Sequence, residues 1–246
     1  MWALFIAELK RLWARPLLRR ALLIGSVLAV GIGVTSNPEA DAIGGVTMAA
    51  SVRFVVPLVA VVFAATAAGS WCSSGTEQLL CQWTGSRGRL FVAEVAAVVI
   101  AAMGVSVTLF TETAATLLIR AAAQGSELAP HFEPLSARAG GLVLACLLGG
   151  SFGAGLGLLT RSSGASLTVV ALLYVLLEPI VLSGARTAGI GVLLYPPISS
   201  LAAAGVMRST DVGEVVSPDI ALAASVGWVV LIVTAAALRM LRRDLS

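Results

Sequence analysis

The polar side chains best placed to do chemistry in this 246-residue chain lie inside apolar runs. Thr108, Glu112 and Thr116 fall at i, i+4 and i+8, so on a helix they form one polar line. An ionisable residue surrounded by hydrocarbon is costly and marks a functional position by default. Two interpretations are open: the line is a wall of a substrate path or water-filled cavity, or the glutamate is protonated and makes interhelical hydrogen bonds.

Two further carboxyl groups lie in apolar runs. Glu178 precedes Pro179, which removes a backbone N–H and is expected to kink the helix. Its carboxylate can cap the break, pair with an arginine or belong to the same substrate path. Glu94 lies one turn into the run that starts near residue 91, where a salt bridge or snorkelling to the interface is expected.

The residues of an enzyme active site are missing from the sequence. His131 is the only histidine, so no Cys/His metal site is expected, and the serine pair in "SSGASL" (162–167) has no histidine base within a run. No phosphate-binding loop with Gly-Lys-Ser/Thr occurs, and Lys10 is the only lysine. We expect no catalysis, metal or cofactor on this chain; any ATP and Mg²⁺ would be bound by a partner.

The composition places the chain in a membrane. It is 58% hydrophobic and 12% charged, with a mean hydropathy of +0.98, whereas soluble domains carry about 25% charged residues. Six apolar runs are long enough to be membrane helices, although the first is marginal. They cover residues 18–35, 48–70, 91–119, 139–160, 164–184 and 219–239. The predicted fold is an all-α polytopic membrane protein with a single domain over residues 1–246. With one lysine and no dense basic run, a nucleic-acid partner is not expected.

Residues 1–16 are predicted to form an interfacial helix that lies on the membrane lipid. Its apolar stripe follows the i, i+3, i+4, i+7 rule, and Glu8 and Arg11 lie off that stripe. We expect a bend into the first span near Pro16. A cleavable signal peptide ending near "VTS" is the less favoured interpretation, because the segment before the apolar run is long and has its own helical pattern.

The distribution of arginine and lysine predicts the orientation. With the N-terminus in the cytoplasm, the inner side receives 11 of these residues and the outer side receives 5: Arg53, Arg120, Arg138, Arg186 and Arg208. Both termini and residues 73–90 are therefore predicted to be cytoplasmic. Arginine far outnumbers lysine, which is typical of a GC-rich bacterial genome, so the expected location is a bacterial cytoplasmic membrane. None of the three cysteines falls in an outer loop, so no disulfide is expected.

Two connecting segments have helical patterns of their own. In 73–85, Ser73 or Ser74 can cap a short helix and Gly85 can end it. Its apolar stripe is Thr76, Leu79, Leu80 and Trp83, and Glu77, Gln78 and Gln82 remain for a partner or water. An interfacial helix that only rests on lipid is the alternative. Residues 188–206 are apolar, too short to cross and broken at Pro196-Pro197, which favours two re-entrant half-helices over a surface amphipathic stretch.

Three stretches together resemble a known family: "SSGTEQLLCQWTGSRGRLFVAEVAA", "GLGLLTRSSGASLTVVALLYVLLEPIV" and "YPPISSLAA". The chain resembles the membrane permeases of type 2 ATP-binding-cassette exporters, over nearly its whole length but with loose motifs. The resemblance implies six spans, a cytoplasmic coupling helix at 73–85 and a re-entrant segment at 188–206. It also implies docking of a cytosolic ATPase at Ser74, Gly75, Thr76, Glu77, Gln78, Leu79, Leu80, Gln82 and Trp83. One departure is Trp71, where family members often have an acid.

The expected function is therefore that of a permease half, which pairs with itself or a sibling and exports an amphipathic or hydrophobic substrate. The energy would come from ATP hydrolysis on a separate ATPase chain. Two other functions remain open. One is a six-span anchor or regulatory subunit that does not transport, and the other is an ion-coupled carrier that uses Glu112 or Glu178 in a proton relay.

Overall fold

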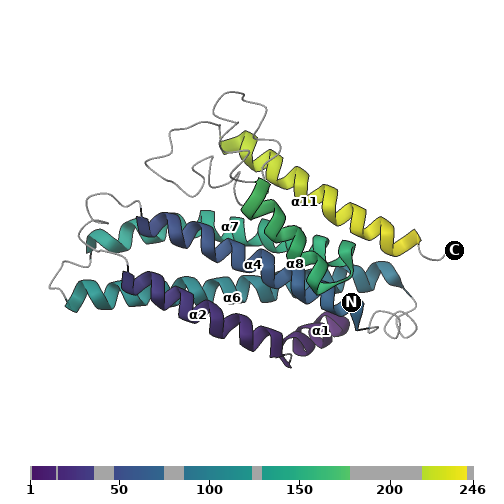
Figure 1. The fold of residues 1–246 in the computed structure, drawn as a ribbon, viewed down its shortest axis with the longest axis horizontal. Helices are drawn as coiled ribbons and strands as arrows, with labels where there is room; N and C mark the ends of the chain where they lie inside the picture. The colour runs from purple at the N-terminus through teal and green to yellow at the C-terminus, as the bar shows by residue number, and fades with distance from the viewer. Residues whose placement is uncertain are drawn as a thin grey trace.

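Helices make up the structure throughout the residues that it describes. A computed structural model describes residues 2–14, 16–35, 47–74, 86–123, 129–177 and 218–242, and no strand occurs in these ranges. The helices are α1 (Trp2–Ala14), α2 (Pro16–Thr35), α4 (Thr47–Ser73), α6 (Arg87–Ala123), α7 (Ala129–Thr160), α8 (Ser163–Ala171) with its π-helical continuation η1 (Leu172–Leu177), and α11 (Pro218–Leu241) (Figure 1). The predicted all-α class is confirmed for these residues.

Four helices are long and apolar enough to cross a membrane: Val55–Ser73, Arg87–Arg120, Gly140–Thr160 and Leu222–Leu241. They correspond to the predicted spans 48–70, 91–119, 139–160 and 219–239. Helix α2 covers the predicted span 18–35 but is not among the four, and Ser163–Tyr174 is a shorter apolar helix within the predicted span 164–184. The count of six spans therefore stays a prediction. The re-entrant segment 188–206 and residues 75–85 of the coupling helix lie outside the described residues.

Helix α4 lies at the centre of the packing, in contact with α7, α6, α8 and α2. Its contact with α7 depends on small residues: a Cβ at Gly153 or Gly157 would collide with the backbone oxygen of Val61 or Ala65. Gly153 and Gly157 are four residues apart, a spacing at which small residues let two membrane helices approach closely. The two helices can approach only because these side chains are absent.

Helix α8 packs on α4 through backbone contacts as well. A Cβ at Gly69 would lie 2.8 Å from the carbonyl carbon of Ser162, and the buried Ser166 Oγ donates to the carbonyl of Ala65 at 3.1 Å. Arg161, with φ of 60°, makes the tight turn from α7, and Ser162 then caps α8 by accepting from the Ala165 N–H. Ser166 therefore fixes a helix contact in the middle of the "SSGASL" segment.

Both chain ends lie at one end of the bundle, together with the C-terminal end of α4 and the start of α6 (Figure 1). The predicted bend near Pro16 is confirmed, since α1 ends at Ala14 and α2 starts at Pro16, where a proline is tolerated at the first helical position. Two arginine side chains form hydrogen bonds between helix termini at this end. Arg87 Nη1 donates to the Met240 carbonyl at 3.4 Å, and Arg239 donates to the carbonyl of Leu159.

Candidate functional site

A buried ionic cluster joins α1 to α4 and α6. We call Glu8, Arg11, Trp71 and Glu94 the basal cluster. Arg11 Nη2 donates to both carboxylate oxygens of Glu94, at 3.2 and 3.1 Å, and Arg11 Nε lies 2.6 Å from Glu8 Oε2. The guanidinium carbon lies 5.9 Å from the centre of the Trp71 ring, within the range of a cation–π contact. One cation thus connects three helices.

The side chains of the basal cluster are largely buried. Glu94 and Trp71 are 0% exposed, Glu8 is 3% exposed and the Arg11 side chain is 22% exposed. Charges in such a position need close partners, because removing one partner of a buried pair costs about 3–5 kcal/mol. The salt bridge expected for Glu94 is confirmed, with Arg11 as its partner.

The packing of α1 differs from the simple interfacial helix that its sequence predicts. Leu12 is buried and Phe5 packs against the core, whereas Trp2 and Trp13 are 73% and 59% exposed. Glu8 and Arg11, which the periodicity assigns to the polar side, point into the bundle. Part of the apolar stripe therefore contacts protein, and the charged pair docks α1 onto α6.

Trp71 occupies the position at which the resemblance leads one to expect an acid. It is fully buried among residues of α6, α7 and α11, including Leu90, Leu158 and Met240. With Glu8 and Glu94 already facing Arg11, a third carboxylate there would add negative charge without a second cation. Its side chain is not available to a docking partner.

Among the predicted docking residues, only Ser74 is described. It is exposed at the end of α4, its Oγ donates to the Trp71 carbonyl at 3.0 Å, and its N–H donates to the Ser70 carbonyl at 3.1 Å. Gly75, Thr76, Glu77, Gln78, Leu79, Leu80, Gln82 and Trp83 lie outside the described residues, so their docking role stays a prediction.

Glu112 forms the interhelical hydrogen bond that one of its two interpretations requires. Ser26 Oγ on α2 donates to Glu112 Oε1 at 3.0 Å, while Glu112 Oε2 is buried and has no hydrogen-bond partner among the described residues. One residue before Ser26, Gly25 packs so closely that a Cβ would lie 2.6 Å from Leu109 Cδ2. That close approach brings the serine to the carboxyl group.

The predicted polar line continues along α6 on either side of Glu112. Thr108 is exposed and its hydroxyl donates to the Gly104 carbonyl at 2.9 Å. Thr116 is half-buried and donates to the Glu112 carbonyl at 2.8 Å. Glu178 lies outside the described residues, so the structure does not bring it to this line. The role of the line in a substrate path remains a prediction.

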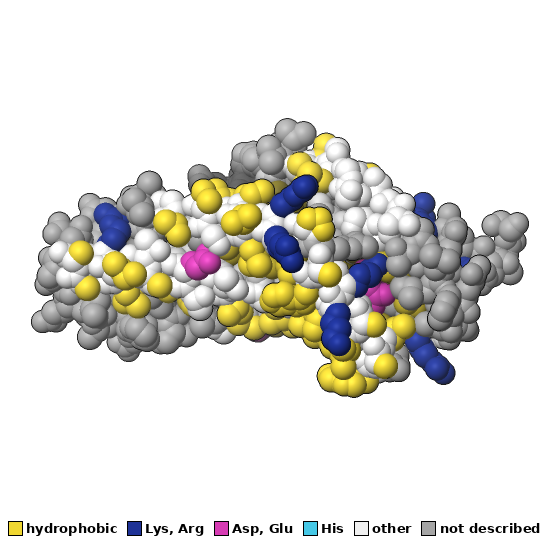
Figure 2. All heavy atoms as spheres, turned by 90° about the horizontal axis from the view of Figure 1, so that it is seen from below, with side chains coloured by type: hydrophobic (Ala, Val, Ile, Leu, Met, Phe, Trp, Pro, Cys, Tyr) yellow, Lys and Arg dark blue, Asp and Glu magenta, His cyan; other side chains and the backbone are white. Residues whose placement is uncertain are grey.

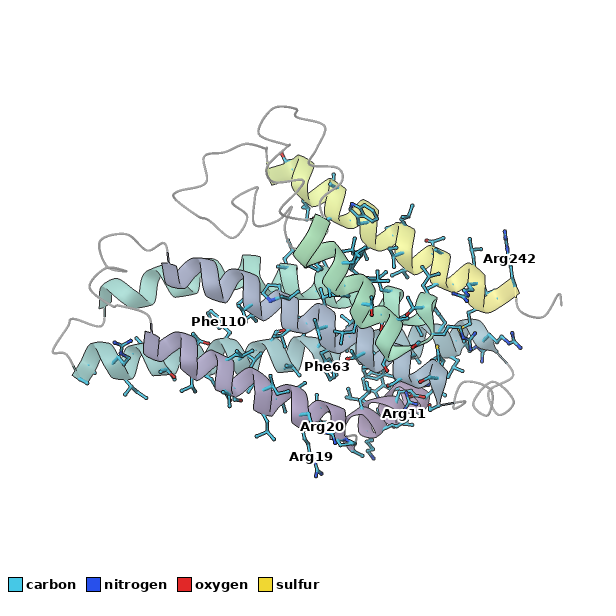
Figure 3. All side chains as sticks on the ribbon, viewed as in Figure 1. Arg11, Arg19, Arg20, Phe63, Phe110 and Arg242 are labelled. Carbon is cyan, nitrogen blue, oxygen red and sulfur yellow. The ribbon has the colours of Figure 1, made fainter. Side chains whose placement is uncertain are left out.

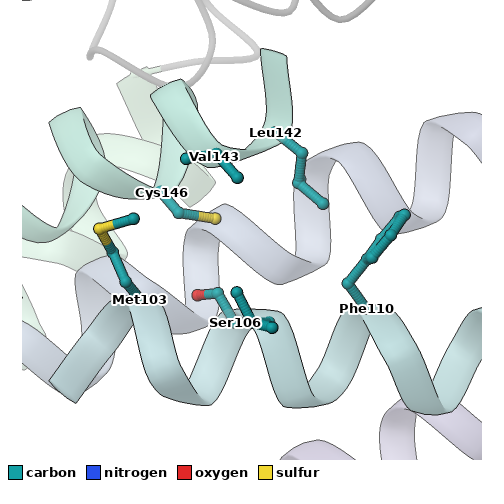
Figure 4. A pocket seen from close by; sticks show the side chains of 7 residues that line it. Met103, Ser106, Phe110, Leu142, Val143 and Cys146 are labelled. Atoms are coloured by element: carbon teal, nitrogen blue, oxygen red, sulfur yellow. The ribbon is translucent and has the colours of Figure 1, made fainter. Parts of the chain in front are cut away.

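A small apolar pocket of about 40 Å³ lies between α6 and α7 (Figure 4). Cys146 and Ser106 are buried in its wall, and Val107 and Val143 are 51% and 42% exposed. This volume is enough for roughly one to three water molecules and is far below the several hundred Å³ of a typical small-molecule site. Since Glu112 is not among its lining residues, the pocket and the polar line are separate features of α6.

The described residues contain no group of three His, Cys, Asp or Glu side chains that could hold a metal ion. No protein-family model matches this chain, and no curated protein matches it. The resemblance to type 2 exporter permeases therefore rests on the sequence alone. Within the described ranges, the basal cluster and the Ser26–Glu112 contact each join polar side chains of different helices.

Proposed function

We propose that this chain is the permease half of an ATP-binding-cassette exporter, driven by a separate cytosolic ATPase. The observation that carries the proposal is the position of Arg11, which binds Glu94 on α6 and lies over Trp71 on α4. These are the two helices that flank segment 75–85, the predicted coupling segment. The N-terminal helix and both stems of that segment are thereby joined at one level of the bundle.

The distances along the helices are short enough for movement of segment 75–85 to be transmitted to the helix bundle. Segment 75–85 begins four residues after Trp71 and ends nine residues before Glu94, or about 6 and 14 Å along the helices. From Glu94, α6 runs without interruption to Glu112, about 27 Å farther on. Movement of the coupling segment on ATP binding would therefore shift α4, α6 and α1 together and reach the polar line.

The charge distribution supports an orientation with both termini in the cytoplasm. The starts of α2 and α6, the end of α11 and the residue after α7 carry Arg19, Arg20, Arg87, Arg89, Arg161, Arg239 and Arg242, and Lys10 and Arg11 lie on α1. Figure 3 labels four of them, and in Figure 2 most of the Lys and Arg side chains lie on the right-hand half of the face shown. Arg120 lies at the opposite end of α6. Such asymmetry is the basis of the positive-inside rule.

The proposal is tested by co-expressing the chain with the ATP-binding-cassette ATPase encoded nearest to it. We expect the two to co-purify in detergent, and inverted vesicles that contain both to accumulate substrate only with ATP. Glu77→Lys combined with Gln78→Lys should remove the ATPase from the complex without unfolding the permease. A charge reversal in the predicted outer loop, Glu127→Lys, is the matched control and should leave binding unchanged.

Each alternative gives a different result in the same experiment. A non-transporting anchor or regulatory subunit would bind a partner but produce no ATP-dependent accumulation. An ion-coupled carrier would accumulate substrate under a proton gradient without any ATPase, and Glu112→Gln or Glu178→Gln would abolish that uptake. If no ATPase co-purifies and ATP drives no transport, the exporter proposal is wrong.

A further inference from the structure

We propose that Glu112 and the hydroxyl groups beside it form a binding site for the positive group of an amphipathic organic cation. The inference names the substrate class of the exporter and rests, for transport alone, on the proposed function. The site is defined by Ser26 on α2 and by Thr108, Thr111 and Glu112 on α6. It differs from the apolar pocket near Cys146, which Glu112 does not line.

The carboxyl group has one oxygen with a hydrogen-bond partner and one buried oxygen without a partner among the described residues. Glu112 Oε1 accepts from Ser26 Oγ, while Oε2 is buried without a hydrogen-bond partner in the described part of the chain. No salt bridge is found between Glu112 and a lysine or arginine whose side chain is described. A charged carboxylate in such a position is stabilised by a positive group, and Oε2 is the oxygen to which that group would bind.

The neighbouring hydroxyl groups present acceptors, not donors. Thr108 donates its hydroxyl hydrogen to Gly104 at 2.9 Å, and Thr111 donates to Thr108 at 2.8 Å. Ser26 likewise uses its hydrogen on Glu112. Because the hydrogens are committed, these oxygens have only lone pairs left to offer a ligand. Such a site favours an ammonium, guanidinium or other cationic group and disfavours an anion.

The site lies deep between two arginine levels. Ser26 is six residues from Arg20 on α2, and Glu112 is eight residues from Arg120 on α6, or about 9 and 12 Å along the two helices. In the predicted span 91–119, Glu112 lies seven residues, or about 10 Å, beyond the midpoint, so it is inside the hydrocarbon core on the side of Arg120. A ligand there must be soluble in lipid over most of its surface.

The surroundings supply that apolar surface. Leu23 and Val27 on α2 are 68% and 73% exposed, and Ile119 on α6 is 70% exposed. Thr108 and Thr111 are exposed on α6 as well, so exposed hydroxyl and aliphatic side chains both occur on the helix segments around Glu112. A ligand with a positive group and a large apolar part would match both the hydroxyl and the aliphatic side chains, and it could reach them from the lipid.

Binding is tested on the purified chain alone, in nanodiscs without ATPase or ATP. The probe is radiolabelled tetraphenylphosphonium, measured by equilibrium dialysis, with neutral triphenylphosphine oxide for comparison. We expect Glu112→Gln to weaken binding of the cation at least tenfold and to leave the neutral compound unaffected. Thr108→Val with Thr111→Val should weaken it less. The control is Thr168→Val, an exposed threonine on α8 that also donates to its own helix, and it should change nothing.

A second measurement uses the wild-type chain, so it stands even where Glu112→Gln does not fold. Dicyclohexylcarbodiimide modifies carboxyl groups within membranes, and mass spectrometry locates the adduct. Tetraphenylphosphonium should reduce labelling of Glu112 at least fivefold. Equal cation binding by wild type and Glu112→Gln, or labelling that the cation does not change, overturns the proposed site. Since neither assay needs the ATPase, loss of ATPase co-purification with intact cation binding would reject the exporter and leave the site.

Discussion

Arg11 donates two hydrogen bonds from Nη2 to the carboxylate of Glu94, a residue 83 positions away, at 3.2 and 3.1 Å. The Glu94 side chain is completely buried. An arginine is suited to this position because its planar guanidinium can hold Glu94, approach Glu8 and lie over the Trp71 ring at the same time. The contact makes the N-terminal helix part of the bundle and not only a surface attachment.

Replacement of Arg11 should destabilise the protein strongly. In Arg11→Ala, the buried carboxylates of Glu8 and Glu94 lose the guanidinium that both of them contact, so we expect the free energy of unfolding to fall by about 3–5 kcal/mol. Arg11→Lys should lose an intermediate amount of stability, since lysine keeps the positive charge but lacks the planar guanidinium group with its several N–H donors. Thermal unfolding in detergent measures the effect. The exposed Arg19 is the control, with an expected change within about 0.5 kcal/mol for Arg19→Ala, and equal melting of the two alanine variants would contradict the prediction.

Trp71 should tolerate an aromatic replacement but not an acid. Trp71→Phe keeps a ring beneath the guanidinium but leaves a small void where the larger indole was buried, so we expect a loss of about 1–2 kcal/mol. Trp71→Glu places a third carboxylate beside a single guanidinium in a fully buried position. Its cost should be at least that of Arg11→Ala, measured by the same thermal unfolding. A Trp71→Glu variant as stable as Trp71→Phe would show that another cation serves this position.

The close packing of α4 on α7 should depend on two glycines. In Gly157→Ala and Gly153→Ala the new Cβ meets a backbone oxygen, which cannot turn aside as a flexible side chain can. We expect each to cost about 1–3 kcal/mol by overpacking. Gly104→Ala and Gly227→Ala are matched controls, because nothing lies within 4 Å of the position of the new Cβ. Those controls should be neutral or up to about 1 kcal/mol more stable, since alanine favours a helix over glycine.

The sequence predicts the helices well because their signals are local. Run length and composition fix where α4, α6, α7 and α11 occur, and Pro16 marks the start of α2. The four-residue spacing of Gly153 and Gly157 is also readable as a packing face. In each case the physical cause lies within a few residues of its effect.

The polar contacts are harder to predict because each has one partner far away in the chain. On α1, the periodicity assigns Glu8 and Arg11 to the polar side, and nothing in residues 1–16 points to Glu94 as their partner. Ser26 is a single serine in an apolar run, so its hydrogen bond to Glu112, 86 positions away, gives no periodic signal. An acidic residue within an apolar run is expected to have a polar or charged partner. This rule identifies Glu94 and Glu112 in the sequence, but it does not identify their partners.

The contact between Ser26 and Glu112 should depend on how closely α2 approaches α6 at Gly25. A Cβ at this position would lie 2.6 Å from Leu109 Cδ2, the far end of a side chain that can turn, so Gly25→Ala should cost less than about 1 kcal/mol. Gly25→Val adds two more methyl groups, which should push α2 outward, lengthen the hydrogen bond and cost about 1–3 kcal/mol. Gly31→Val on the same helix is the control, since nothing lies within 4 Å of its new Cβ. If binding of tetraphenylphosphonium falls in Gly25→Val but not in Gly31→Val, the spacing of the two helices sets the geometry of the carboxyl site; equal binding in both would show that Glu112 acts without Ser26.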